Sequence, residues 1–230
     1  MRDHSPRRAI GQRTKTIDPW NRYKRKMVER KTVFMAIATF NMDQVKGYVK
    51  FSEAGNNVRI DIRLSNMEPD STHAIHIHEY GDVRGGCKST GGHWNPTNTT
   101  HGSYLVPSRP RHLGDLINNL ETDERGNFSF SYVESGYEIS ELYGRTIVIH
   151  TLADDLGLQG VQGRHEIIPY SCFSRNGLAA LCRQRGYFGD EVDDISFTEL
   201  LNKLNTQSLK TGNAGGRMAC AIIGRINESF

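Results

Sequence analysis

The sequence lacks long apolar runs and has few hydrophobic residues for its length. Only 37% of its 230 residues are hydrophobic, and the mean hydropathy is −0.56. No stretch of about 18 apolar residues occurs, which excludes a transmembrane helix. The first residues also lack the apolar segment of a secretory signal peptide, so we expect an intracellular, most simply cytoplasmic, location. A chain of this length can bury one substantial core.

Acidic residues are scarce at the beginning of the chain. Residues 1–31 contain eleven lysines and arginines against three acidic residues, a net charge of +8, whereas the whole chain carries +3. Residues 32–230 are therefore net acidic. Pro6 and Pro19 interrupt the basic segment, which predicts a mobile, solvated extension. A tether for nucleic acid or another polyanion is the alternative, and interspersed acidic residues disfavour an organelle-targeting segment.

Short segments rich in β-branched and aromatic residues begin after the basic extension. In residues 57–64, Val58, Ile60, Ile62 and Leu64 alternate with polar residues, which is typical of a strand with one buried face. Comparable segments are 32–40, 44–51, 73–78, 127–134, 145–150 and 218–226. Seven such segments joined by Gly, Asn and Asp turns predict an all-β sandwich or barrel.

Two stretches interrupt the strand pattern. Residues 79–120 hold many glycines, histidines and asparagines, and so long a loop in a compact domain is usually functional. Residues from about 158 to 205 have helical spacing, first in a short helix between Ser174 and Gly186. The second helix has an apolar stripe behind an Asp194 cap, formed by Phe197, Leu200, Leu201 and Leu204. We interpret this stretch as a helical insert whose stripe covers part of the sandwich.

Three histidines lie within the segment HAIHIH, residues 73–78. In a strand, His76 and His78 point to the same face, which indicates a metal site. The alternative at this point is a strand whose exposed face is rich in histidine. His150 ends another strand, and a set made only of imidazoles suits copper.

A second group of metal-binding side chains falls in the long loop. His93, His101 and His112 each stand beside Gly, Pro or Asp in irregular chain, and Asp115 follows His112 by three residues. Three imidazoles and one carboxylate form the closed four-ligand set that suits zinc.

Together these motifs resemble the copper/zinc superoxide dismutase family from about Val33 to Ile226. The resemblance is carried by HAIHIHEYGD, GCKSTGGHWNP, RHLGDL, GRTIVIHTLADDLG and KTGNAGGRMACAIIG. It implies a Greek-key β-barrel of about eight antiparallel strands over residues 32–230, with long metal-binding and active-site loops. It also implies one copper and one zinc ion per subunit, and disproportionation of superoxide to dioxygen and hydrogen peroxide.

The resemblance assigns roles to the metal-binding residues position by position. Its copper ligands are His76, His78, His93 and His150, and its zinc ligands are His93, His101, His112 and Asp115. His93 would bridge the two metals. Asp154 matches the carboxylate that joins a copper histidine to a zinc histidine. His73 is expected to brace the backbone.

Five further residues acquire a role from the resemblance. Arg217 matches the guanidinium beside the copper, where a fixed cation attracts and orients a small anion. Lys210 and Thr211 match channel-lining positions. Cys87 and Cys220 match the family's disulfide, which is unusual in a reducing compartment.

The chain departs from the family pattern around the channel. Leu152 stands where the family usually has a lysine, and Thr206 and Gln207 replace a common acidic pair. Because of the insert, the active-site arginine follows the last copper histidine by 67 residues. Such an insert fits a divergent member of the family, a viral one included. Cys172 and Cys182 have no family counterpart, and the sequence leaves open whether they pair.

Three other functions compete with dismutation. A copper carrier of the metallochaperone type would need a separate Cys-based copper domain, which the four cysteines do not form. A catalytically impaired binding protein would have lost a copper ligand or Arg217, and neither is lost. The extension and insert could also serve as an interaction module on an active enzyme.

Homodimerisation is expected because YGDVRG, LYG and IIGRI match the family's contact segments, although Tyr143 and Arg225 are unusual there.

Overall fold

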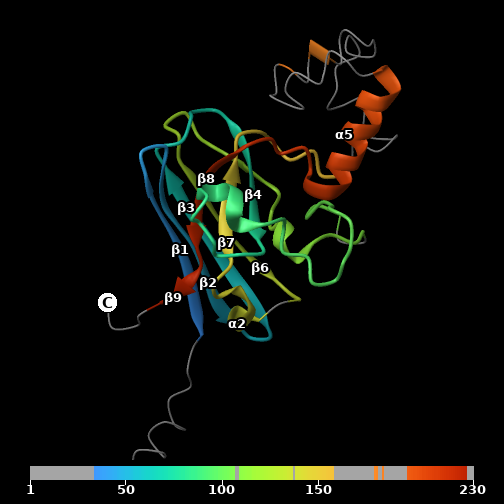
Figure 1. The fold of residues 1–230 in the computed structure, drawn as a ribbon. Coiled ribbons are helices and arrows are strands. Elements are labelled where there is room, and N and C mark those ends of the chain that lie inside the picture. Colours follow the sequence, from blue (N-terminus) through green and yellow to red (C-terminus); the bar gives the residue numbers. More distant parts are fainter. Residues whose placement is uncertain are drawn as a thin grey trace, which may run out of the picture. The chain divides into compact units, whose positions relative to one another are not determined.

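Two antiparallel sheets make up most of the computed structural model, which describes residues 34–106, 109–136, 138–157, 179–180, 183 and 196–226 (Figure 1). The five-stranded sheet has the order β6-β3-β2-β1-β9. Its strands are β1 (Met35–Met42), β2 (Val45–Ala54), β3 (Asn57–Ser65), β6 (Phe128–Glu134) and β9 (Gly224–Arg225). The four-stranded sheet has the order β5-β4-β7-β8. Its strands are β4 (Thr72–His78), β5 (Asn119–Glu121), β7 (Thr146–His150) and β8 (Arg217–Ile222).

This architecture confirms the predicted all-β class and corrects two details. The expected single strand over residues 218–226 is divided at Ile223, so that β8 pairs with β7 and β9 pairs with β1. The chain thereby passes from one sheet to the other, and the Ile223 N–H donates to the Arg145 carbonyl at the crossing, 2.8 Å away. The short strand β5 also begins within the predicted loop of residues 79–120 and ends one residue beyond it, where no alternating pattern marks it.

The core lies between the two sheets and is built from alternating apolar positions. Val58, Ile60, Ile62 and Leu64 of β3 are all buried, as the period of two predicts. In β4, Ile75 and Ile77 enter the same core, whereas His76 and His78 belong to the other face of the strand. Because that face is also buried, long loops must cover it.

Four helices have bounds within the described residues. They are the 3₁₀ helices η1 (Gly86–Thr90) and η2 (Leu113–Asp115) and the α-helices α2 (Ile139–Leu142) and α5 (Phe197–Thr211). The cap of α5 is Ser196, whose hydroxyl accepts from the Glu199 N–H at 3.3 Å, so the predicted Asp194 cap is wrong. Leu200 and Leu204 are buried, which agrees with the predicted stripe.

α5 ends later than the predicted insert. It continues to Thr211 and terminates at Gly212, which has a left-handed conformation with φ 67°. A side chain at Gly212 would overlap the carboxylate of Asp154 and the ring of His101. The end of this helix therefore packs directly against the histidine-rich region.

Several predictions fall outside the described residues. The basic extension of residues 1–31, both cysteines 172 and 182, and the Ser174 and Gly186 ends of the first insert helix are among them. Residues 179–180 and 183 of that helix are helical. Within the described residues, no helix is both long and apolar enough to cross a membrane.

A disulfide between Cys87 and Cys220 joins η1 to β8, as predicted. The two Cα atoms are 5.7 Å apart, and the residues are separated by 133 positions in sequence. The disulfide thus closes a long loop of chain, and this loop contains His93, His101, His112 and His150.

Replacing this disulfide should destabilise the fold. Cys220→Ser is expected to lower the free energy of unfolding by about 2–5 kcal/mol, because the unfolded chain regains the entropy of an open loop. Urea denaturation followed by circular dichroism measures the change. Dithiothreitol should destabilise the original protein and have little further effect on the variant; equal unfolding midpoints for the two oxidised proteins would contradict the expectation.

Candidate metal centre

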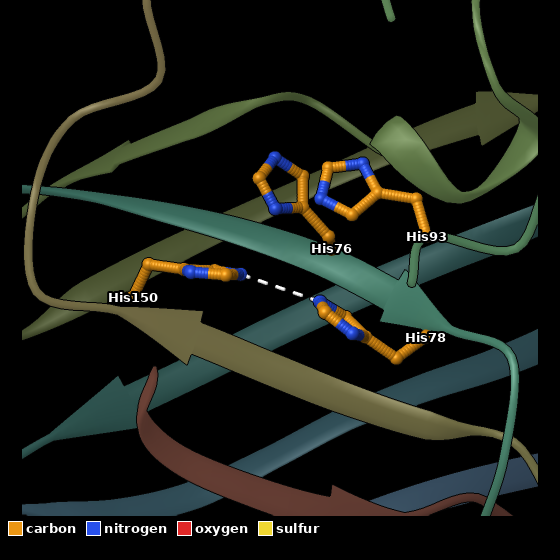
Figure 2. A group of neighbouring side chains, drawn as sticks. All are labelled: His76, His78, His93 and His150. Atoms are coloured by element: carbon orange, nitrogen blue, oxygen red, sulfur yellow. Dashed lines mark hydrogen bonds between the residues drawn. The ribbon is translucent and has the colours of Figure 1, made fainter. Parts of the chain in front are cut away.

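Four imidazole rings converge on the outer face of β4 (Figure 2). His76 and His78 come from β4, and His150 comes from the end of the adjacent strand β7. His93 lies in the loop after η1 and forms an isolated β-bridge with His78. The Nε2 atoms of His78 and His150 are 3.3 Å apart, and the ring centroids of His76 and His93 are 4.0 Å apart. All four side chains are buried.

Hydrogen bonds on the far side of the rings fix their orientation. The Nδ1–H of His78 donates to the Gly91 carbonyl at 2.9 Å, and the Nε2–H of His76 donates to Asp154 Oδ2 at 2.7 Å. The opposite nitrogens of His76 and His93, Nδ1 and Nε2 respectively, are buried and have no hydrogen-bond partner among the described residues. Buried nitrogens without partners are costly unless an ion satisfies them, so this cluster fits a metal.

A second cluster surrounds the carboxylate of Asp115. Its Oδ1 lies 2.9 Å from Nδ1 of His93, 2.9 Å from Nδ1 of His101 and 3.0 Å from Nδ1 of His112. Its Oδ2 accepts from the backbone N–H groups of Gly102 and His112. Three nitrogens around one oxygen form an N₃O donor set that can hold zinc. His93 contributes to both clusters through its two ring nitrogens.

Asp154 connects the two clusters. While Oδ2 accepts from His76, Oδ1 accepts from the Nε2–H of His101 at 2.8 Å. Asn118 Nδ2 donates to Oδ2 at 3.1 Å, and the Leu156 N–H donates to Oδ1 at 2.6 Å. Both histidines bond to Asp154 through Nε2, so the Nδ1 atom of each ring is left for its own cluster.

His73 lies outside both clusters. Its Nδ1–H donates to the His150 carbonyl at 2.9 Å, and its Nε2 is 3.0 Å from Ser71 Oγ. Both ring nitrogens therefore bind the protein itself, and the residue braces the end of β7.

Arg217 lies opposite His150 in the β7–β8 register and close to the first cluster. Its Nη1 donates to the Cys87 carbonyl at 2.7 Å and to Thr90 Oγ1 at 2.9 Å, and its Nη2 donates to the Gly91 carbonyl at 2.5 Å. The guanidinium is thus held by the segment that the disulfide anchors.

Lys210 and Thr211 occupy the last turn of α5 and line a cavity of about 410 Å³. His93 and His112 line the same cavity, so these two predicted channel residues lie beside the histidine clusters. Of the departures from the family pattern, Thr206 lines the same cavity and Gln207 donates to Thr211 Oγ1. A side chain at Gly215 would meet Leu152, so Leu152 packs against that glycine.

Burial governs the protonation of the first cluster. It lowers the pKa of His76 to about 4 and those of His93 and His150 to about 3, and it also lowers the pKa of His78 well below its ordinary value. These imidazoles are therefore neutral at pH 7, which is the form that binds metals.

The second cluster behaves in the opposite way. Burial acts to lower the pKa of His101, but its hydrogen bonds with Asp115 and Asp154 raise it to about 10. Burial likewise opposes ionisation of Asp115, yet the bonds from the surrounding histidines hold its pKa well below the usual range. Without a metal, His101 is a cation between two carboxylates.

These shifts predict a stability maximum near pH 6.5 for the metal-free protein. Below pH 6.5 the unfolded chain protonates His76, His93 and His150, whereas the folded chain does so only near pH 3–4, so acid favours unfolding. Above pH 6.5 the unfolded chain loses the proton of His101, which the folded chain keeps to about pH 10, so base also favours unfolding. Urea unfolding of chelator-treated protein at pH 4.5, 6.5 and 9 tests this; stability that rises steadily to pH 9 would contradict it.

Three residues of the centre were not predicted from the sequence. Thr90 contacts Arg217, Asn118 contacts Asp154, and Asp155 accepts from Ser208 Oγ at 2.9 Å. Asp155 adjoins a predicted residue and could have been considered. Thr90 is the last residue of η1 and Asn118 stands in a bend, and only the folded structure shows which side chain each of them contacts.

Comparison with known proteins agrees with this geometry. The family model described as copper/zinc superoxide dismutase (SODC) matches residues 45–167. A "Superoxide dismutase [Cu-Zn]" of Paramecium bursaria Chlorella virus 1 is 33% identical over 81% of this chain and 76% of its own length. An "Extracellular superoxide dismutase [Cu-Zn]" of Drosophila melanogaster is 33% identical over 79% of this chain and 76% of its own length.

A solved structure is also similar. The crystal structure of the clock protein EA4 matches with a TM-score of 0.58 and 28% identity, covering 85% of this chain and 97% of the other. The family-model match extends over more than half of the chain, and the viral relative is 33% identical over 81% of it. The family uses copper and zinc, which the two clusters could hold. The chain therefore belongs to the copper/zinc superoxide dismutase family.

Proposed function

We propose that this chain is a superoxide dismutase that converts two superoxide ions and two protons into dioxygen and hydrogen peroxide. The observation that carries the proposal is the position of His93, which belongs to two complete four-residue clusters at once. A histidine with a purely structural role would not need to direct its two ring nitrogens at two separate buried clusters of metal-binding side chains, as His93 does.

The two clusters would hold different metals. His76, His78, His93 and His150 offer four nitrogens suited to copper, and His93, His101, His112 and Asp115 offer the N₃O set suited to zinc. When bound, copper would supply a one-electron redox change between two oxidation states, and zinc would supply a fixed positive charge.

His93 is the residue best placed to move a proton. Its Nδ1 faces Asp115 Oδ1 at 2.9 Å, and its Nε2 faces the first cluster. If Nδ1 stays engaged in the second cluster, Nε2 can accept a proton and release it to the reduced product without the ring turning. Each turnover consumes two protons, so a residue that exchanges protons at this atom serves the chemistry directly.

Arg217 would attract and orient the anionic substrate. Its positive charge contributes to the lowered pKa values of His78 and His150, which places it within electrostatic reach of the first cluster. A cation fixed beside a neutral imidazole set favours a small anion there, and such fields raise encounter rates.

We also propose a homodimer. The contact segments expected from the resemblance present apolar side chains to solvent, with Tyr80 58% exposed and Ile222 44% exposed. Arg225 lies 5.8 Å from the Phe34 ring and 6.0 Å from the Tyr143 ring, so its charge is partly covered by aromatic faces of its own chain. That arrangement supports a contact surface that tolerates an arginine.

Pulse radiolysis of the full chain loaded with copper and zinc tests the proposed activity. The dismutation rate should far exceed that of metal-loaded His78→Ala, because this substitution removes one nitrogen from the first cluster. His165→Ala, which changes a histidine outside every matched motif, is the control and should keep the rate. Full metal content without dismutation would contradict the proposal and favour a binding or copper-carrier role.

A second experiment tests the carboxylate that joins the clusters. Asp154→Asn should weaken both metal affinities by about 10–100-fold, since partners of ligating histidines fix ring orientation and basicity. Competition with a chromogenic chelator measures each affinity. Asp123→Asn, at an exposed turn position, serves as the control, and equal affinities in both variants would show that Asp154 does not orient the ligands.

A further inference from the structure

Residues 87–91 hold the guanidinium of Arg217 through hydrogen bonds. Nη1 donates to the Cys87 carbonyl at 2.7 Å, to Thr90 Oγ1 at 2.9 Å and, at 3.3 Å, to the Lys88 carbonyl. Nη2 donates once, to the Gly91 carbonyl. Nε makes no hydrogen bond with any residue that the structure describes, so the donors that remain for a ligand are Nε and one N–H of Nη2.

Thr90 is the only side chain among these contacts, and its own geometry is fixed. The residue is completely buried, with 0% exposure. Its hydroxyl donates to the Cys87 carbonyl at 2.9 Å, so the oxygen must present a lone pair, rather than its proton, to Arg217. Thr90 and the guanidinium therefore meet as acceptor and donor in a single arrangement.

This contact restricts the arginine in a way that carbonyl groups alone do not. Arginine has a long, flexible side chain. Hydrogen bonds to the Cys87 and Gly91 carbonyls alone would still let the Arg217 guanidinium tilt. A buried hydroxyl that is itself anchored to Cys87 adds a third point, and three points define the plane of the guanidinium. A fixed plane determines where the remaining N–H groups point.

We propose that Thr90 is a positioning residue, which holds the Arg217 guanidinium so that its remaining N–H donors face a small anion at the first histidine cluster. The inference rests on the proposed role of Arg217. A solely structural Thr90 would stabilise η1 through its bond to Cys87 and would leave anion binding unchanged.

Azide binding tests this proposal in the copper- and zinc-loaded full chain. Azide is a small monoanion whose binding to Cu(II) produces a charge-transfer absorption band, so its dissociation constant can be titrated without measuring turnover. Thr90→Val should weaken azide binding by about 10-fold, the order expected for losing one hydrogen bond to a charged group. Thr90→Ser keeps the hydroxyl and should restore the original affinity.

The same titration in an Arg217→Ala background separates the two proposals. If Arg217→Ala weakens azide binding and Thr90→Val adds nothing further, the two residues act as one unit and the inference is supported. If Arg217→Ala alone leaves azide binding unchanged, the proposed role of Arg217 fails. If Arg217→Ala weakens binding but Thr90→Val does not, only the role of Thr90 is overturned.

Two further measurements distinguish a local effect of Thr90→Val on Arg217 from a general loss of stability. Ser89 Oγ donates to the Asp82 and Gly86 carbonyls and is not among the hydrogen-bond partners of Arg217, so Ser89→Ala should lower stability but keep azide affinity. Nitrogen-15 NMR of the metal-free chain measures rotation about the Nε–Cζ bond of Arg217. Thr90→Val should accelerate this rotation and Thr90→Ser should not; equal rates in all three proteins would overturn the proposal.

Discussion

The hydrogen bonds of one buried carboxylate, that of Asp154, are the interaction on which the rest of the centre depends. It accepts from His76 on one oxygen and His101 on the other, so two histidines from distant parts of the chain share one anchor. A carboxylate in a buried position is costly unless its partners satisfy it. Here the two imidazoles and Asn118 do so, and the result is that both ring orientations are determined together.

The arrangement of α5 follows from the neighbouring carboxylate. Asp155 accepts from Ser208 and Asn213, and the carbonyl of Leu209 accepts from the N–H of His101 at 2.8 Å. Burial raises the pKa of Asp155, and these bonds act against that effect. Helix α5, which continues past the predicted insert, is therefore joined to the same loop that carries the second cluster.

Much of the fold could be predicted from the sequence because the strands follow a simple rule. In β3 the alternation of apolar and polar residues gives both the strand and its buried face, and in β4 it places His76 and His78 together. The short strand β5 has three residues and no alternation, so only its pairing with β4 creates it. The division of β8 from β9 likewise depends on which sheet each part meets.

The ligand candidates could be predicted by resemblance, whereas their supports could not. His93, His101, His112 and Asp115 stand in recognisable motifs, and the structure brings them together as expected. Thr90 is the last residue of η1, and only the fold shows that Arg217 lies beside it. The Ser196 cap shows the same limit, because Asp194 and Ser196 are both reasonable caps by residue type and only the helix geometry distinguishes them.

The dispersed origin of the histidines has a consequence for assembly of the protein. His78 and His150, whose rings face each other, are 72 residues apart in sequence, and they meet only when β4 pairs with β7. An unfolded chain cannot offer this donor set, because no short segment contains it. A metal bound by all four histidines therefore stabilises the native state relative to the unfolded chain, and its free concentration shifts the folding equilibrium by mass action.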